Sequence, residues 1–171
     1  MKVNSPAIGF KTGLLSVLLL LSISPLGLTS EIDDKQPLPD IRWQDVDGKT
    51  HHLKDSHGKP RLLHFWAAWC IPCRKEMPEM LTWQAENPDI LVIPLSLDQR
   101  MAQTKHFIKK NKLDMPAFLV NEDDRDALSI PAVPYTIFVS SDGLFSGDLY
   151  GIAPWEDDAF TKSVHQQLKL K

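Results

Sequence analysis

Cysteine is scarce in this sequence, which contains only Cys70 and Cys73 among its 171 residues. Two thiols cannot form the several disulfides that stabilise a small secreted scaffold. A structural zinc site would need two further ligands with suitable spacing, and the sequence has no second pair of cysteines. The three histidines around a polar hairpin are expected to be exposed rather than to bind metal: His51, His52 and His57. No metal site is therefore predicted.

Clusters of basic residues are also missing, and the formal net charge is −3 at pH 7. Binding to nucleic acid requires lysine and arginine concentrated on one face or segment, so we expect no nucleic acid partner. Internal repeats are absent as well. Residues 31–171 are therefore expected to form one domain with its own hydrophobic core.

Charged residues are absent from Thr12 to Ser30, and Lys2 and Lys11 precede this apolar stretch. The pattern is typical of an export segment over residues 1–30. It predicts either a signal peptide or an N-terminal membrane anchor, because a helix of about 19 residues spans about 28 Å, close to the hydrocarbon thickness of a bilayer. Positive charge before the apolar run places the N-terminus in the cytoplasm. We therefore expect the domain in the periplasm or another extracytoplasmic, oxidising compartment.

Hydrophobic periodicity beyond residue 38 predicts strands that alternate with helices. Asp47-Gly48 separates two short alternating runs and indicates an N-terminal hairpin. The expected strands lie at residues 41–46, 49–53, 61–67, 90–97, 117–120, 135–139 and 144–150. The expected helices lie at residues 71–87, 99–112 and from 155 to the C-terminus, and 121–126 is expected to be a solvated loop or the start of a helix. Such alternation implies parallel strands covered by helices on both faces.

The two cysteines lie in Trp69-Cys70-Ile71-Pro72-Cys73, where an apolar strand is followed by a helix. A helix N-terminus supplies backbone N–H groups and partial positive charge, which favour the thiolate form of Cys70. The alternative is a structural disulfide, but a loop this short would contribute only roughly 2 kcal/mol, against about 5 kcal/mol for a loop of a hundred residues. The pair therefore predicts a redox site.

Three features of the sequence, taken together, are specific enough to indicate a protein family. They are the segment Phe65-Trp66-Ala67-Ala68-Trp69-Cys70-Ile71-Pro72-Cys73-Arg74-Lys75-Glu76-Met77-Pro78, the segment Val133-Pro134-Tyr135-Thr136 and the early hairpin. In these features the chain resembles the thioredoxin superfamily from about residue 38 to residue 170, and within it the exported TlpA/ResA/DsbE-like thiol-disulfide oxidoreductases. The resemblance implies an α/β, thioredoxin-like fold, in which a central mixed β-sheet is flanked by helices and an N-terminal β-hairpin is added.

The resemblance also implies roles for the matching residues. Cys70 corresponds to the attacking cysteine, and Cys73 corresponds to the resolving cysteine. Pro134 corresponds to a proline that follows a cis peptide bond beside the disulfide. The expected substrate-binding positions surround the cysteines and this proline: Trp69, Ile71, Pro72, Val133 and Pro134.

Proton transfer at Cys73 requires a nearby acid or base, and His64 and Glu76 are the candidates. Glu76 matches the family's glutamate just inside the active-site helix. His64 occupies the strand position where thioredoxins carry a buried aspartate and many TlpA-like chains an asparagine, so the proton-transfer arrangement differs here. The alternatives are that His64 is a buried core histidine and that Glu76 is a charge complementing the helix dipole.

The resemblance favours a reductase of disulfides in exported proteins, supplied with electrons by a membrane thiol transporter of the DsbD or CcdA kind. The expected targets are apocytochromes in cytochrome c biogenesis, cysteine-containing metal-handling proteins and other exported proteins. No cofactor is expected beyond the redox-active Cys70–Cys73 disulfide. Two alternatives remain open: a disulfide oxidase or isomerase, and a non-enzymatic module that binds or delivers copper through the two thiols and a histidine.

Overall fold

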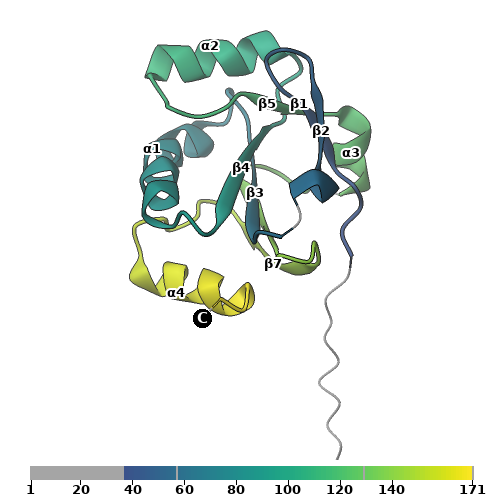
Figure 1. Ribbon diagram of the computed structural model, residues 1–171. Helices are drawn as coiled ribbons and strands as arrows, with labels where there is room; N and C mark the ends of the chain where they lie inside the picture. The colour runs from purple at the N-terminus through teal and green to yellow at the C-terminus, as the bar shows by residue number, and fades with distance from the viewer. Residues whose placement is uncertain (1–36, 57, 129, 171) are drawn as a thin grey trace, which may run out of the picture. The chain divides into compact units, whose positions relative to one another are not determined.

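The computed structural model describes residues 37–170 with the exception of residues 57 and 129 (Figure 1). His57 and the predicted signal peptide or membrane anchor at residues 1–30 lie outside the described residues. Among the helices of the described part, none is long and apolar enough to cross a membrane.

Seven strands of the described part form one mixed sheet in the order β2-β1-β5-β4-β3-β6-β7. Their bounds are β1 (Arg42–Gln44), β2 (Thr50–His52), β3 (Arg61–Trp66), β4 (Leu91–Ser96), β5 (Phe118–Val120), β6 (Tyr135–Val139) and β7 (Phe145–Tyr150). The pairings of β3 with β4 and of β4 with β5 are parallel, whereas every pairing that involves β1, β2, β6 or β7 is antiparallel. The expected α/β fold with a central mixed sheet is confirmed.

The predicted N-terminal hairpin is formed by β1 and β2. Its turn is closed by the side chain of Asp45, whose Oδ1 accepts hydrogen bonds from the backbone N–H groups of Asp47 and Lys49, each at 3.0 Å. Gly48 has a φ of +78°, a conformation that favours glycine. Strand β1 also pairs with β5, so the hairpin extends the sheet at one edge.

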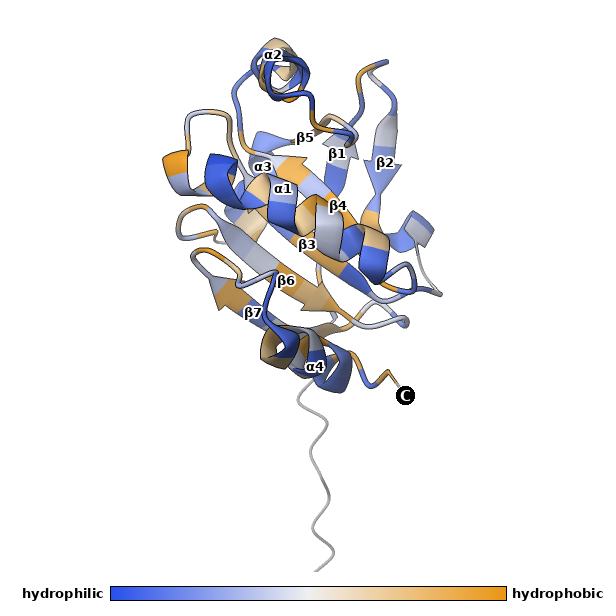
Figure 2. Ribbon diagram, turned by 90° about the vertical axis from the view of Figure 1, so that its left-hand side faces the viewer, coloured by the Kyte–Doolittle hydropathy of each residue, from blue (hydrophilic) through white to orange (hydrophobic). Residues whose placement is uncertain are grey.

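Helices cover both faces of the sheet. The helical bounds are η1 (Leu53–Ser56), a 3-10 turn, and α1 (Ile71–Glu86), α2 (Met101–Asn111), α3 (Glu122–Ala127) and α4 (Asp158–Gln167). Buried side chains of α1, α2 and α4 share one core cluster with Leu62 and Trp66 of β3, and Figure 2 looks onto this face. The other face packs against Leu53 of η1 and Leu128, which directly follows α3.

Residue alternation along β3 decides which side chains lie under α1. Leu62 and Trp66 belong to the core cluster on the α1 side, whereas Leu63 and Phe65 belong to the opposite cluster. Because side chains alternate between the two faces of a strand, His64 shares the face of Leu62 and Trp66. The alternation therefore places the imidazole ring of His64 on the face of the sheet that α1 covers.

The acidic segment at residues 121–126 is helical rather than a solvated loop. Its Asp124 is 8% exposed and forms an ion pair with Arg42 of β1, with Asp124 Oδ2 3.2 Å from Arg42 Nε. Arg42 Nη2 also donates to Asp124 Oδ1 at 3.2 Å. The expectation of a helix start is confirmed. Asp124 is buried because its ion pair with Arg42 connects α3 to the hairpin.

Candidate active site

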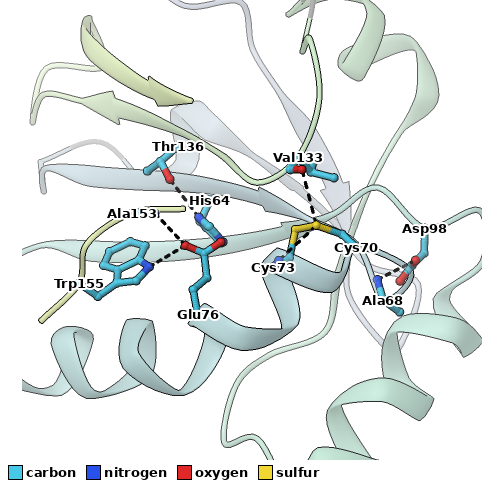
Figure 3. Close-up of a disulfide and its surroundings, with 10 residues drawn as sticks. All are labelled: His64, Ala68, Cys70, Cys73, Glu76, Asp98, Val133, Thr136, Ala153 and Trp155. Carbon is cyan, nitrogen blue, oxygen red and sulfur yellow. Dashed lines mark hydrogen bonds and ion pairs between the residues drawn. A yellow bond between two sulfur atoms is a disulfide. The ribbon is translucent and has the colours of Figure 1, made fainter. Parts of the chain in front are cut away.

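Cys70 and Cys73 form a disulfide at the N-terminus of α1, with their sulfur atoms 2.04 Å apart (Figure 3). Cys70 is the N-cap residue, and its Sγ accepts a hydrogen bond from the backbone N–H of Cys73 at 3.2 Å. Pro72 lies in the first turn, where its missing N–H would have had no partner inside the helix. The predicted position of the motif, between a buried strand and a helix, is confirmed.

The two cysteines differ slightly in exposure. Cys70 is 4% exposed and Cys73 is fully buried, whereas the neighbouring side chains Trp69 and Ile71 are 65% and 64% exposed. A partner protein approaching this surface would therefore contact Trp69 and Ile71 and reach Cys70 before Cys73. This order suits an attacking Cys70 and a resolving Cys73, roles that stay predictions.

The peptide bond between Val133 and Pro134 is cis, as predicted. It precedes β6, whose pairing with β3 aligns Tyr135 with Phe65 and brings the loop back to the disulfide. The carbonyl oxygen of Val133 lies 3.6 Å from Cys70 Sγ, although the two residues are 63 positions apart in the sequence. In the reduced protein, a thiol at Cys70 is placed to donate a hydrogen bond to this carbonyl.

His64 and Glu76 point toward each other beside the disulfide, and both side chains are fully buried (Figure 3). His64 Nε2 lies 3.6 Å from Glu76 Oε1, and neither atom has a hydrogen-bond partner within the described residues. His64 Nδ1 lies 3.0 Å from Thr136 Oγ1. Glu76 Oε2 accepts hydrogen bonds from the backbone N–H of Ala153 at 3.0 Å and the indole N–H of Trp155 at 3.1 Å. Glu76 is therefore a buried group, not an exposed helix-end charge.

Burial shifts the pKa values of this pair in opposite directions. Desolvation lowers the pKa of His64 from 6.5 to about 3, which keeps the ring neutral. Desolvation raises the pKa of Glu76 from 4.5 to about 7, against the opposing effect of the hydrogen bonds from Ala153 and Trp155. At a pH between about 3 and about 7, the Glu76 carboxyl is therefore protonated and His64 is neutral, so the carboxyl can offer its proton to His64 Nε2. A carboxyl that titrates near pH 7 is suited to proton transfer.

Asp98 is a buried residue of the site that the sequence reasoning missed. It is 5% exposed, and its Oδ1 accepts a hydrogen bond from the backbone N–H of Ala68 at 3.0 Å. Its Oδ2 accepts hydrogen bonds from the hydroxyls of Ser96 at 2.9 Å and Thr104 at 2.8 Å. These contacts fix the backbone that enters the cysteine turn. The available signal was a carboxylate just beyond a buried parallel strand, at the sheet end where sites of α/β proteins lie.

The histidines of the hairpin are half-buried rather than exposed, because each is paired with an aspartate. His51 Nε2 lies 2.7 Å from Asp45 Oδ2, and His52 Nδ1 lies 2.8 Å from Asp40 Oδ2. Across the described part of the chain, no group of three or more histidine, cysteine, aspartate or glutamate residues is arranged to hold a metal ion.

Comparisons with known proteins agree with this geometry. The sequence model of the AhpC/TSA family matches residues 35–144. The thioredoxin-like protein YneN of Bacillus subtilis is 30% identical over 117 residues, which cover 66% of this chain and 69% of that protein. The thiol-disulfide oxidoreductase ResA of Geobacillus thermodenitrificans is 26% identical over 156 residues, covering 83% and 88% respectively. The solution structure of a thiol:disulfide interchange protein from Bacteroides sp. matches with a TM-score of 0.65 at 27% identity, over 79% of this chain and 90% of that one.

Proposed function

Because the chain belongs to the AhpC/TSA family of thioredoxin-like proteins and is a thiol-disulfide oxidoreductase, we propose that it acts as a reductase of disulfides in exported proteins. The observation that carries the proposal is the Cys70–Cys73 disulfide at the start of α1, with the Val133 carbonyl beside Cys70. The reductase direction is supported by the resemblance to the TlpA/ResA-like proteins. The apolar segment at residues 1–30 supports action outside the cytoplasmic membrane.

The reaction is a pair of thiol-disulfide exchanges. The thiolate of Cys70 attacks one sulfur of the target disulfide, and that S–S bond breaks to give a mixed disulfide and a target thiolate. The thiolate of Cys73 then attacks Cys70 Sγ, which releases the second target thiolate and forms the Cys70–Cys73 disulfide. Two electrons pass from the protein to the target, and the two protons lost by the cysteines are matched by those that the target thiolates gain.

Several features of the site support this division of roles. The backbone N–H of Cys73 donates to Cys70 Sγ, and such a donor together with the helix N-terminus favours a thiolate at Cys70. The exposed Trp69 and Ile71 and the nearby Val133 provide a surface for the segment that surrounds the target cysteine. An extended target strand would pair with the backbone of Val133, whose carbonyl oxygen lies 3.6 Å from Cys70 Sγ.

His64 and Glu76 are proposed to carry the proton that Cys73 exchanges. Glu76 lies three residues after Cys73 on α1, and residues at this spacing are neighbours on a helix surface. Its raised pKa allows it to be protonated or ionised near neutral pH. His64 faces it across 3.6 Å and contacts Thr136 through its other nitrogen, so a change of tautomer can accompany proton movement.

Continued turnover requires that the Cys70–Cys73 disulfide be reduced again. In an oxidising compartment the electrons would come from a membrane thiol transporter of the DsbD or CcdA kind. Apocytochromes, metal-handling proteins with cysteine pairs and other exported proteins are the proposed targets. A disulfide oxidase or isomerase would use the same two sulfurs, and the reduction potential of the pair distinguishes these activities.

The proposal is tested by turnover of a protein disulfide. The reduced protein should reduce insulin, Cys70→Ala should abolish the reaction, and Cys73→Ala should accumulate a mixed disulfide through Cys70. Ser163→Ala, on the exposed surface of α4, is the matched control and should react like the wild type. Tight binding of cuprous copper without any reduction of insulin would instead identify a copper-binding module.

A further inference from the structure

A groove of about 560 Å³ lies beside the disulfide. One side is lined by Ala68 and Trp69, which directly precede Cys70, and by Arg74, which directly follows Cys73. The other side is formed by α2 and the residues just before it. Figure 3 shows Ala68 and Asp98, two of its lining residues, next to Cys70. A substrate segment attached to Cys70 therefore has this groove within reach.

The exposed side chains that line the groove are mostly basic. The basic ones are Arg74, Arg100, His106 and Lys110, and the other exposed lining residues are Trp69, Ala102 and Asn111. Arg100 is the N-cap residue of α2, and His106 and Lys110, four residues apart, lie on one side of that helix. Within the described residues, no carboxylate lies within ion-pair distance of Arg74, Arg100 or Lys110. The first turn of α2 contains no acidic residue, so its partial positive charge adds to that of the side chains.

This concentration of positive charge contrasts with the chain as a whole, whose formal net charge is −3. Asp98 is the one carboxylate among the lining residues, and its oxygens accept hydrogen bonds from Ala68, Ser96 and Thr104. The guanidinium of Arg74 lies over the ring of Phe107, with its carbon 5.6 Å from the ring centroid. A guanidinium held on a ring face keeps N–H donors at its edge for an anion.

We propose that this basic groove binds acidic residues that flank the reacting cysteine of the protein substrate. The inference rests on the proposed exchange reaction at Cys70. It adds that this reaction prefers substrate segments with negative charge. Two observations favour an acidic peptide: the unpaired cations and the continuity of the groove with the residues on either side of the cysteines. Complementary charge increases the rate of productive encounter, so the preference for acidic segments should appear as a higher kcat/KM.

The test uses two sets of three peptides that contain the same intramolecular disulfide. Within a set, glutamate, glutamine or lysine occupies the variable positions, which lie before the reacting cysteine in one set and after it in the other. The full-length reduced protein should give the highest kcat/KM with a glutamate peptide and the lowest with the lysine peptide. The preference for glutamate over glutamine should be about threefold to fivefold for each cation engaged, and it should shrink in high salt.

Variants at Arg100 and Lys110 test whether the groove causes this preference. Arg100→Gln and Lys110→Gln should each reduce the ratio of kcat/KM for the glutamate peptide to that for the glutamine peptide, and Arg100→Lys should restore most of it. Arg100→Glu should reduce this ratio further than Arg100→Gln does, because it adds a negative charge as well as removing a positive one. Lys162→Gln removes an exposed charge on α4, distant in sequence from the groove lining, and should leave the ratio as in the wild type.

Equal kcat/KM values for all three peptides in both sets would overturn the inference while leaving the proposed exchange reaction intact. A glutamate preference that is undiminished in both Arg100→Gln and Lys110→Gln would also overturn it, because the charge would then be recognised elsewhere. Failure to reduce any of the peptides would count against the proposed function itself. The two failures are therefore distinguishable.

Discussion

Replacing Glu76 with glutamine should add a pH dependence of stability that the intact His64–Glu76 pair does not contribute. In the wild type, midway between pH 4.5 and 6.5, the unfolded pair carries one proton, on His64, since ordinary pKa values of 4.5 and 6.5 leave the glutamate ionised and the histidine protonated. The folded pair also carries one proton, on Glu76, because burial raises the pKa of Glu76 to about 7 and lowers that of His64 to about 3. Because the folded and unfolded states bind the same number of protons there, this pair does not make stability depend on pH.

Glu76→Gln removes the folded-state proton but leaves His64 buried and neutral. The unfolded state then binds more protons than the folded state, by about one at pH 4.5 and by about half at pH 6.5, where the unfolded His64 is half titrated, so stability must rise with pH. This difference corresponds to about 1.4 kcal/mol per pH unit near pH 4.5, and to about 2.3 kcal/mol in total from pH 4.5 to 6.5. His64→Asn should have the opposite sign: the folded state keeps the Glu76 proton that the unfolded state loses, so stability falls as pH rises toward 7.

The assay is denaturant unfolding of the oxidised protein at half-unit steps from pH 4.5 to 7.5. The difference in free energy of unfolding between variant and wild type is the quantity to plot, because the other titrating groups cancel in it. The double variant, which lacks both ionisable groups, should run parallel to the wild type between pH 4.5 and 6.5. Parallel curves for all four proteins would refute the assignment of the proton to Glu76 and the neutral form to His64.

Three further predictions concern the chemistry of the site. In alkylation followed against pH, the thiol of Cys70, isolated in Cys73→Ala, should titrate below the unperturbed pKa of about 8.5, and faster labelling of Cys73 at neutral pH would reverse the two roles. Pro134→Ala should slow exchange with protein substrates, and undiminished rates would remove Pro134 from substrate binding. Exchange rates from about pH 5 to 9 should change their profile in His64→Asn and Glu76→Gln. Unchanged profiles and cysteine titrations would make His64 a core histidine and Glu76 a structural carboxyl, and a shift from Glu76→Gln alone would leave only the glutamate as proton carrier.

The parts of the site that are encoded locally could be predicted from the sequence. The cysteine motif follows an apolar strand and opens a helix, and both elements are formed by residues next to it. Val133 and Pro134 were predicted as site residues through the family resemblance, to which the segment before an apolar strand contributes. Their cis bond and their position beside the cysteines were expected only through the family resemblance, since spacing alone does not select a rare cis isomer.

The surroundings of the buried charges could not be predicted in the same way. The donors to Glu76 come from Ala153 and Trp155, which lie 77 and 79 residues later in a loop without periodicity. Asp98 contacts Ala68 across 30 residues, and its burial depends on how β4 and α2 pack together. Such contacts depend on tertiary packing, so a sequence pattern indicates the type of group but not its partners or its pKa.

The reduction potential of the Cys70–Cys73 pair is the most direct test of the proposed reductase. The purified protein would be equilibrated with glutathione and dithiothreitol buffers of known potential, and the fraction of free thiol measured at each. We expect a midpoint near that of thioredoxin, about −270 mV, which lets the reduced protein donate electrons to target disulfides. A midpoint near that of the oxidant DsbA, about −120 mV, would contradict the reductase and identify the protein as a disulfide oxidase.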